Sequence, residues 1–109
     1  MKTILVPTDF SKAASNAVEY AANLAKAIKA KVVLFHAYHV PVPVSEVPIM
    51  VITPDKLQKE NEAHLKKEAA RLSKKTSVEV TYLAKMGLAV DEILEEAKNA
   101  NLIVMGMKG

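Results

Sequence analysis

The sequence predicts one α/β domain built on a doubly wound parallel sheet, because short apolar runs alternate with segments of helical periodicity along its 109 residues. Two of these runs, residues 3–7 and 102–105, are too short for a buried helix and lack strict alternation, which is typical of strands covered on both faces. The first run stops at Pro-Thr-Asp and the last at Gly-x-x-Gly. In open α/β sheets, ligands bind beyond such strand ends, where the strand order reverses.

Composition limits the class of protein further. No apolar stretch approaches the roughly 18 residues of a membrane span, and the segment after Met1 is too short for a secretory signal, so no membrane contact is expected. The absence of cysteine excludes disulfide and thiolate chemistry and fits a reducing cytoplasm. The net charge of +3 is mild, its cations are interleaved with acids, and aromatic platforms are lacking, which argues against nucleic-acid binding.

A change of period after Asp9 predicts an amphipathic, alanine-rich helix that can lie close to a sheet. Its expected apolar face comprises Ala14, Val18, Ala21, Ala22, Ala25 and Ile28. Either Asp9 or Ser11 is expected to cap the free amides of this helix. Residues 31–38, rich in β-branched side chains, predict the second strand.

Four of the five prolines fall within residues 41–54, which predicts a loop there. Thr53 and Pro54 are expected to be the N-cap and first residue of a helix that runs to about Lys75. Its apolar side is expected to comprise Leu57, Leu65, Ala69 and Leu72. The cations near its end are expected to be solvated and favoured by the helix dipole, with a phosphate or acidic-partner patch as the alternative: Lys66, Lys67, Arg71, Lys74 and Lys75.

Residues 78–85 alternate well enough for a third strand, expected to be more exposed than the others. A turn at Met86 and Gly87 leads to a short helix, whose apolar residues are Val90, Ile93, Leu94 and Ala97. Since crossovers between parallel strands are right-handed, the predicted strand order is 3-2-1-4.

A few residues in this pattern can carry chemistry. Asp9 is the only acid at the end of an apolar strand, where it can cap a helix and also accept hydrogen bonds from ribose hydroxyls or a base amino group. Gly106 and Gly109 would let backbone approach a ligand and expose amides to phosphate, with Lys108 supplying positive charge. His36 and His39 point to opposite faces of a strand, so we expect a structural His36 and no metal site.

Catalytic motifs are not found. Ser11 and Ser15 have no histidine partner in sequence reach, and the sequence holds no Gly-x-Ser-x-Gly elbow, Walker A loop or Rossmann Gly-x-Gly-x-x-Gly. A phosphorelay receiver would need an acidic pair after its first strand and an aspartate after its third, whereas the third strand here ends at Ala84-Lys85. We therefore predict a binding or regulatory module with no catalytic residue of its own.

Together, ILVPTDFS at 4–11, the alanine-rich helix, VVLFHA at 32–37, the Gly87 turn and ANLIVMGMKG at 100–109 resemble the universal stress protein family over essentially the whole chain. The resemblance implies a cytoplasmic stress-response protein that binds an adenine nucleotide. It implies ATP, accompanied by Mg²⁺, with AMP or ADP as alternatives, at most slow ATP hydrolysis, and a homodimer. By resemblance, Pro7, Thr8 and Asp9 would line the adenosine pocket and Ala37 would touch adenine through its backbone. The ribose and phosphate loop would begin with Met105, Gly106, Lys108 and Gly109.

The sequence also departs from the family pattern. Asn101 stands where the family commonly has Asp. The family's motif continues to a second Gly followed by Ser or Thr, then to a last helix and a fifth strand, none of which follows Gly109 here. We therefore expect residues 1–109 to form a single, C-terminally incomplete domain that lacks the fifth strand, with weakened ATP binding. Its apolar edge strand should self-associate or borrow a strand.

The alternative function is that of a family member that binds no nucleotide. Such a protein would act through protein contacts made by the proline-rich segment and the basic helix end.

Overall fold

The computed structural model describes residues 2–38 and 54–106. Its elements run β1 (Thr3–Pro7), α1 (Lys12–Ile28), β2 (Lys31–Tyr38), α2 (Pro54–Thr76), β3 (Val80–Met86), α3 (Ala89–Ala97) and β4 (Leu102–Ile103). The predicted proline-rich loop, apart from Pro54, lies outside the described residues, as do His39, Thr53, Lys108 and Gly109.

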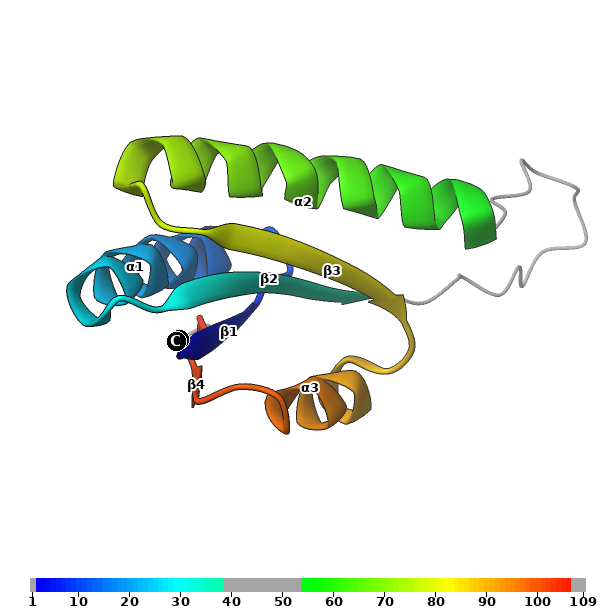
Figure 1. Cartoon of the computed structure of the whole chain (residues 1–109). Helices are drawn as coiled ribbons and strands as arrows, with labels where there is room; N and C mark the ends of the chain where they lie inside the picture. The colour runs from blue at the N-terminus through cyan, green and yellow to red at the C-terminus, as the bar shows by residue number, and fades with distance from the viewer. Residues whose placement is uncertain (1, 39–53, 107–109) are drawn as a thin grey trace, which may run out of the picture.

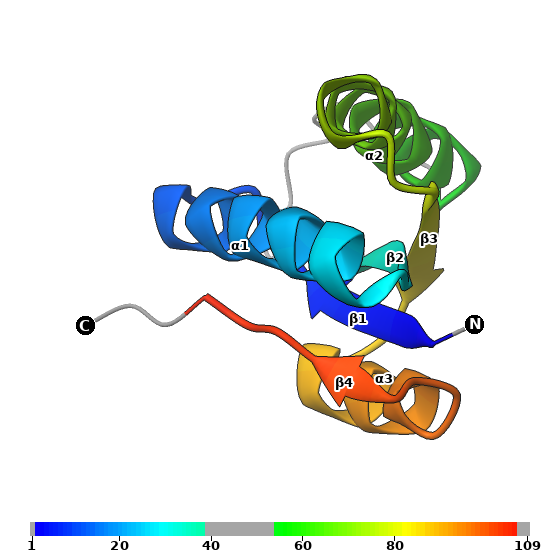
Figure 2. The same ribbon diagram turned by 60° about the vertical axis from the view of Figure 1, so that its left-hand side comes forward.

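The sheet is parallel throughout, with strand order β3-β2-β1-β4, which confirms the predicted fold class and order (Figure 1). The chain moves outward from β1 to β2 to β3 and then returns past β1 to β4. Because each crossover is right-handed, α1 and α2 cover one face and α3 covers the other (Figures 1 and 2). The strand order reverses at β1, so its carboxyl end is the place where a ligand would bind.

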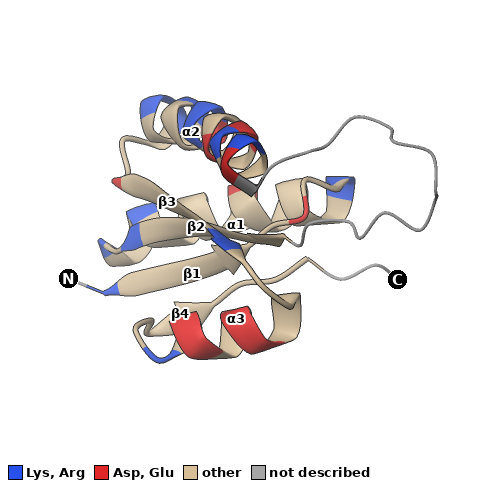
Figure 3. Ribbon diagram, turned by 90° about the vertical axis from the view of Figure 1, so that its right-hand side faces the viewer, with Lys and Arg blue, Asp and Glu red and all other residues tan. Residues whose placement is uncertain are grey.

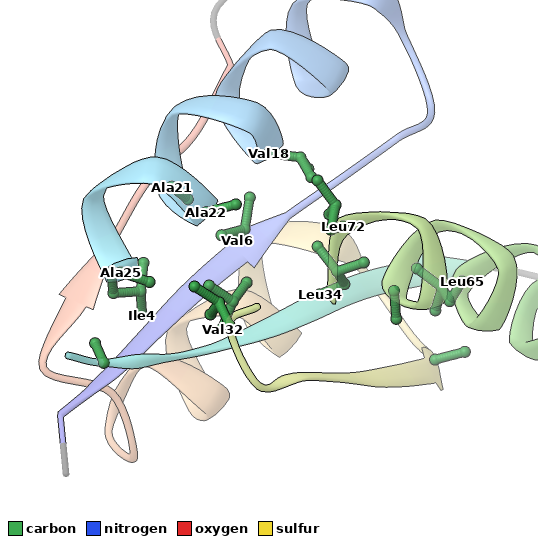
Figure 4. Packing of buried hydrophobic residues seen from close by; sticks show 14 of the residues in the cluster. Ile4, Val6, Val18, Ala21, Ala22, Ala25, Val32, Leu34, Leu65 and Leu72 are labelled. Atoms are coloured by element: carbon green, nitrogen blue, oxygen red, sulfur yellow. The ribbon is translucent and has the colours of Figure 1, made fainter. Parts of the chain in front are cut away.

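The core lies between the sheet and its two-helix layer (Figure 4). Alanines of α1 are fully buried on the central strands, and their small side chains let the helix lie close to the sheet: Ala21, Ala22 and Ala25 against Ile4, Val6, Val32 and Leu34. From α2, Leu65 and Leu72 are fully buried and Leu57 is half-buried, as predicted. Ile28, predicted on the buried face, is instead 38% exposed, because α1 ends there and the chain reverses at Lys29 in a left-handed conformation.

Ion pairs attach the basic end of α2 to α1. Figure 3 marks the positions of the basic and acidic residues along the ribbon. Arg71 lies 2.9 Å from one carboxylate oxygen of Glu19, and Lys75 lies 3.2 Å from the other. Arg71 also pairs with Glu68 at 2.6 Å. The side chains of Arg71 and Lys75 stay 44% and 61% exposed, so both cations are solvated as expected, and in addition each pairs with an acid of the neighbouring helix.

The last strand is shorter and more exposed than predicted. It comprises Leu102 and Ile103 alone, and both side chains are 43% exposed. Among the described strands β4 has a single neighbour, β1, and α3 packs mainly against β1 and β2, so β4 is only partly covered. Figure 2 shows its place at the edge of the sheet. The expectation that this strand is buried on both faces is thus wrong, and β4 is more exposed than β3.

Candidate functional site

A cleft of about 210 Å³ opens at the carboxyl ends of β1 and β2, walled by α3 and by the residues after β4. It includes every predicted site residue that the structure describes, and its lining comprises Pro7, Thr8, Asp9, Ala14, Phe35, His36, Ala37, Ala89, Ile93, Met105 and Gly106. The remaining two predicted site residues, Lys108 and Gly109, fall outside the described part of the chain. Segments from opposite ends of the sequence therefore meet at one cleft.

Backbone and side-chain hydrogen bonds fix the end of β1. The N–H of Thr8 donates to the carbonyl of Phe35 at 2.7 Å and extends the β1–β2 ladder beyond Pro7. The Thr8 carbonyl in turn lies 2.7 Å from Nδ1 of His36. Because a carbonyl oxygen only accepts, Nδ1 of His36 carries the hydrogen. His36 therefore has the structural role that we expected.

Asp9 lies at the mouth of the cleft with an exposed side chain. Its Oδ1 accepts a hydrogen bond from the Ser11 N–H at 2.9 Å. Ser11, not Asp9, is the N-cap of α1, since its Oγ accepts from the N–H of Ala14 at 3.2 Å. The alternative that the sequence left open is thereby decided.

Gly106 has a packing role. A Cβ built on it would lie 2.4 Å from the carbonyl oxygen of Ala13 and 2.8 Å from the amide nitrogen of Ala14. Only glycine lets the segment after β4 pass this close to the first turn of α1. The sequence suggested a close approach to a ligand, whereas the close approach seen here is to backbone of the same chain.

Sequence reasoning missed the α3 wall. Ala89 and Ile93 line the cleft from the sheet face opposite α1. Lys85 holds α3 in place, since its Nζ lies 3.1 Å from Glu96 and 3.6 Å from Glu92. The hydrogen bond with Glu96 raises the pKa of Lys85 above its ordinary value. The reversal of strand order could have indicated this wall. It places the helix after the third strand on the opposite face of the sheet, next to the carboxyl ends of β1 and β2.

Metal ligands do not gather in the described ranges, where no three His, Asp or Glu side chains lie together as an ion would need. In the same ranges, no helix has the length and apolar character required to cross a membrane.

The model of the universal stress protein family matches residues 1–109, the full length of the sequence. The chain belongs to the universal stress protein family. No curated protein sequence matches it.

Solved structures of universal stress proteins share the fold. A family protein from Burkholderia pseudomallei is 27% identical, with a TM-score of 0.73, and the match covers 97% of this chain and 81% of that one. A universal stress protein in complex with cAMP is 23% identical, with a TM-score of 0.70 over 94% of this chain and 69% of that one. A family protein from Arabidopsis thaliana with AMP bound is 17% identical, with a TM-score of 0.68 over 100% of this chain and 78% of that one.

Asn101, which stands where the family commonly has Asp, has a structural role in joining two strands. The Asn101 Oδ1 accepts from the N–H of Thr3 at 2.9 Å, and its own N–H donates to the Thr3 carbonyl at 2.9 Å. These two bonds join the start of β4 to the start of β1. Since a carboxylate oxygen accepts as an amide oxygen does, Asn and Asp can both perform this task.

Proposed function

We propose that this universal stress protein binds an adenine nucleotide in the cleft at the carboxyl ends of β1 and β2 and acts as a regulatory or binding module. One observation carries the proposal: Asp9 and Gly106, almost a chain length apart, line the same cleft beside the strand at which the sheet order reverses. That position is the usual ligand site of open α/β sheets. The cAMP and AMP complexes of proteins with this fold support the choice of ligand.

The cleft lining suits the parts of a nucleoside. The carboxylate of Asp9 would accept hydrogen bonds from ribose hydroxyls or the adenine amino group. Apolar walls at Ala37, Ile93 and Met105 suit the faces of a purine, with the backbone of Ala37 meeting its edge. A volume of about 210 Å³ is below the roughly 300–1,000 Å³ of complete small-molecule sites. We therefore assign the described cleft to the nucleoside half of the ligand.

The phosphate half would lie beyond Gly106. We extend the proposal to ATP with Mg²⁺, whose phosphates would meet the backbone amides of the Gly-x-x-Gly segment and the charge of Lys108. Asp9 is the only carboxylate among the lining residues of the described cleft. It is engaged by the Ser11 N–H, so at most slow hydrolysis is expected. We place the protein in the cytoplasm, a proposal that its lack of cysteine supports.

Calorimetric titration tests the proposal directly. AMP, ADP, ATP and cAMP would be titrated into the protein with and without Mg²⁺, with GMP and GTP as controls of the same charge. We expect adenine nucleotides to bind and the guanine controls to bind more weakly, because the site was assigned to the adenine base. Equal binding of both bases would contradict the assignment of Ala37, and no binding of any nucleotide would contradict the function.

A homodimer is the second element of the proposal. Among the described strands β4 is at the sheet edge, and its outer side offers unpaired backbone groups beside the exposed Leu102 and Ile103. Such an edge is a template for pairing with another chain.

Function through protein contacts alone is the alternative, and one observation favours it. Leu88, the N-cap of α3, is 68% exposed, and Val90 and Leu94 on the helix are 70% and 63% exposed. Exposed apolar side chains that gather in a patch mark sites of protein contact. If no nucleotide binds in the titrations, this surface becomes the leading candidate for a partner.

A further inference from the structure

We propose that His36 and His64 are positioning residues for Asp9, because they hold the two residues on either side of it and so set the direction of its carboxylate. The proposal rests on the nucleotide site proposed above. It concerns a cluster on the opposite face of the sheet from the α3 wall, formed by His36, His64 and Phe10.

His36 lies on the face of the sheet that α1 and α2 cover. Side chains alternate across a strand, and Leu34 and Tyr38 belong to the core beneath α1 and α2, so His36 between them lies on that face. Its Nδ1–H donates to the Thr8 carbonyl at 2.7 Å. This carbonyl belongs to the peptide unit that joins Thr8 to Asp9. The imidazole therefore fixes the plane of the peptide that precedes Asp9.

Phe10, the residue that follows Asp9, has a backbone conformation that is uncommon for a non-glycine residue. Its φ of 64° lies in the left-handed region, which a non-glycine residue keeps only where its surroundings fix it. The Phe10 N–H donates to Thr8 Oγ1 at 3.1 Å, which bridges over Asp9. The strained residue is thus part of the same short turn that presents the carboxylate.

Two imidazole rings contact the ring of Phe10. The His64 ring stacks on the Phe10 ring with centroids 3.8 Å apart and planes 6° apart, and the His36 ring meets it at 4.6 Å and 47°. His64 lies on α2 and is exposed. The stack is therefore not a consequence of His64 being buried in the core. What the stack does is immobilise Phe10.

These contacts make a prediction that a purely stabilising role does not make. A conservative variant that keeps one specific contact should restore the site, even though other properties of histidine are lost. The amide of asparagine can place its N–H close to the position of histidine Nδ1, so His36→Asn keeps the donor to Thr8, whereas His36→Leu removes it. Likewise His64→Phe keeps a stacking ring, and His64→Ala removes it.

The experiment combines two measurements on these four variants and on Lys67→Ala, an exposed position of α2 that serves as control. The first, on ligand-free protein, is the set of backbone amide shifts of residues 8–11 and the coupling constant that reports φ of Phe10. The second is AMP affinity by calorimetry. We expect His36→Leu and His64→Ala to shift these signals and to weaken AMP roughly tenfold, a loss typical of removing residues that orient ligating side chains. Lys67→Ala should match the wild type, and each conservative variant should recover much of the AMP affinity and of the amide signals that the variant without the contact loses; for His36, which also lines the cleft, the comparison that decides is His36→Asn against His36→Leu.

The outcomes separate this proposal from the nucleotide site itself. Unchanged signals in His64→Ala, whose exposed site should not affect folding, would overturn the positioning role, and so would shifted signals with unchanged AMP affinity. If the wild type binds no AMP, the nucleotide function fails, and the signals of residues 8–11 still decide whether the two histidines hold the turn. Failure of His36→Asn to restore what His36→Leu loses would overturn the role of the Nδ1 bond.

Discussion

Gly106 and Ala13 are in backbone contact: a Cβ placed on the glycine would lie 2.4 Å from the alanine's carbonyl oxygen. The contact joins the segment after β4 to the first turn of α1, two parts of the chain that both border the cleft. Because the opposing atoms are backbone, no side-chain rotation can make room for a larger residue. The cleft therefore depends on a glycine that need not touch the ligand.

Replacing Gly106 with Ala should destabilise the fold by about 1–3 kcal/mol, the usual cost of forcing extra atoms into a packed contact. Urea denaturation measures this change in the free energy of unfolding. Val90→Ala, at a side chain that is 70% exposed, is the control and should have little effect. Equal stability of Gly106→Ala and the wild type would show that the two segments separate freely.

Asp9 and Ser11 should separate binding from folding. Ser11→Ala removes the N-cap of α1 and should cost about 1 kcal/mol of stability with little change in AMP affinity. Asp9→Ala should leave stability closer to the wild type and weaken AMP binding by an order of magnitude or more, since ribose hydroxyls lose their acceptor. Thermal denaturation and calorimetry on both variants check this. The reverse pattern would make Asp9 a structural residue only.

Glu19 should make stability depend on pH on the acid side. The hydrogen bond from Arg71, with a further contribution from Lys75, holds the pKa of Glu19 below its ordinary value of 4.5. A lowered folded-state pKa gives stabilisation that is present above the ordinary value and lost as pH falls through the folded-state value. Glu19→Gln should therefore destabilise the protein at pH 7 by up to about 1 kcal/mol, and less as the pH falls below 4.5.

The control for Glu19 is Glu95→Gln, because Glu95 pairs with Lys98 at 3.3 Å in a far more exposed position. Its effect on unfolding should be smaller at every pH. A Glu19→Gln variant whose loss of stability stays constant down to pH 3 would contradict the ion-pair explanation.

The edge strand should govern self-association. Ile103→Lys places a charge on an exposed edge position, a change that discourages strand pairing between chains. We expect the wild type to associate and the variant to shift toward monomer in sedimentation measurements over a range of concentrations. Val90→Lys introduces the same charge on α3 and should leave an edge-paired dimer intact. If Val90→Lys dissociates the dimer and Ile103→Lys does not, the interface is on α3.

The sequence was sufficient for features that depend on local pattern. The apolar run at residues 31–38 gives β2 with its observed bounds, and Pro54 begins α2 as its backbone geometry requires. Alanine spacing gives the buried face of α1. The predicted strand order is also the observed one, and the right-handed crossover then explains on which face of the sheet each helix lies.

Other features depend on contacts between distant residues, which no local pattern encodes. The need for glycine at Gly106 comes from the path of α1, and the stack of His64 on Phe10 comes from how α2 lies over the turn after β1. The short β4 illustrates the same limit, since an apolar run shows that a strand can be buried and not that something covers it.

The location of the nucleotide is the central claim, and chemical-shift mapping tests it most directly. AMP would be titrated into isotopically labelled protein while every backbone amide is followed. We expect saturable shifts at residues that line the cleft at the carboxyl ends of the strands: Asp9, Ala37, Ile93 and Gly106. We expect none at Lys31 and Asn101, which lie at the opposite ends of the strands. Saturable shifts centred on Lys31 and Asn101, with Asp9 and Gly106 unmoved, would contradict the claim.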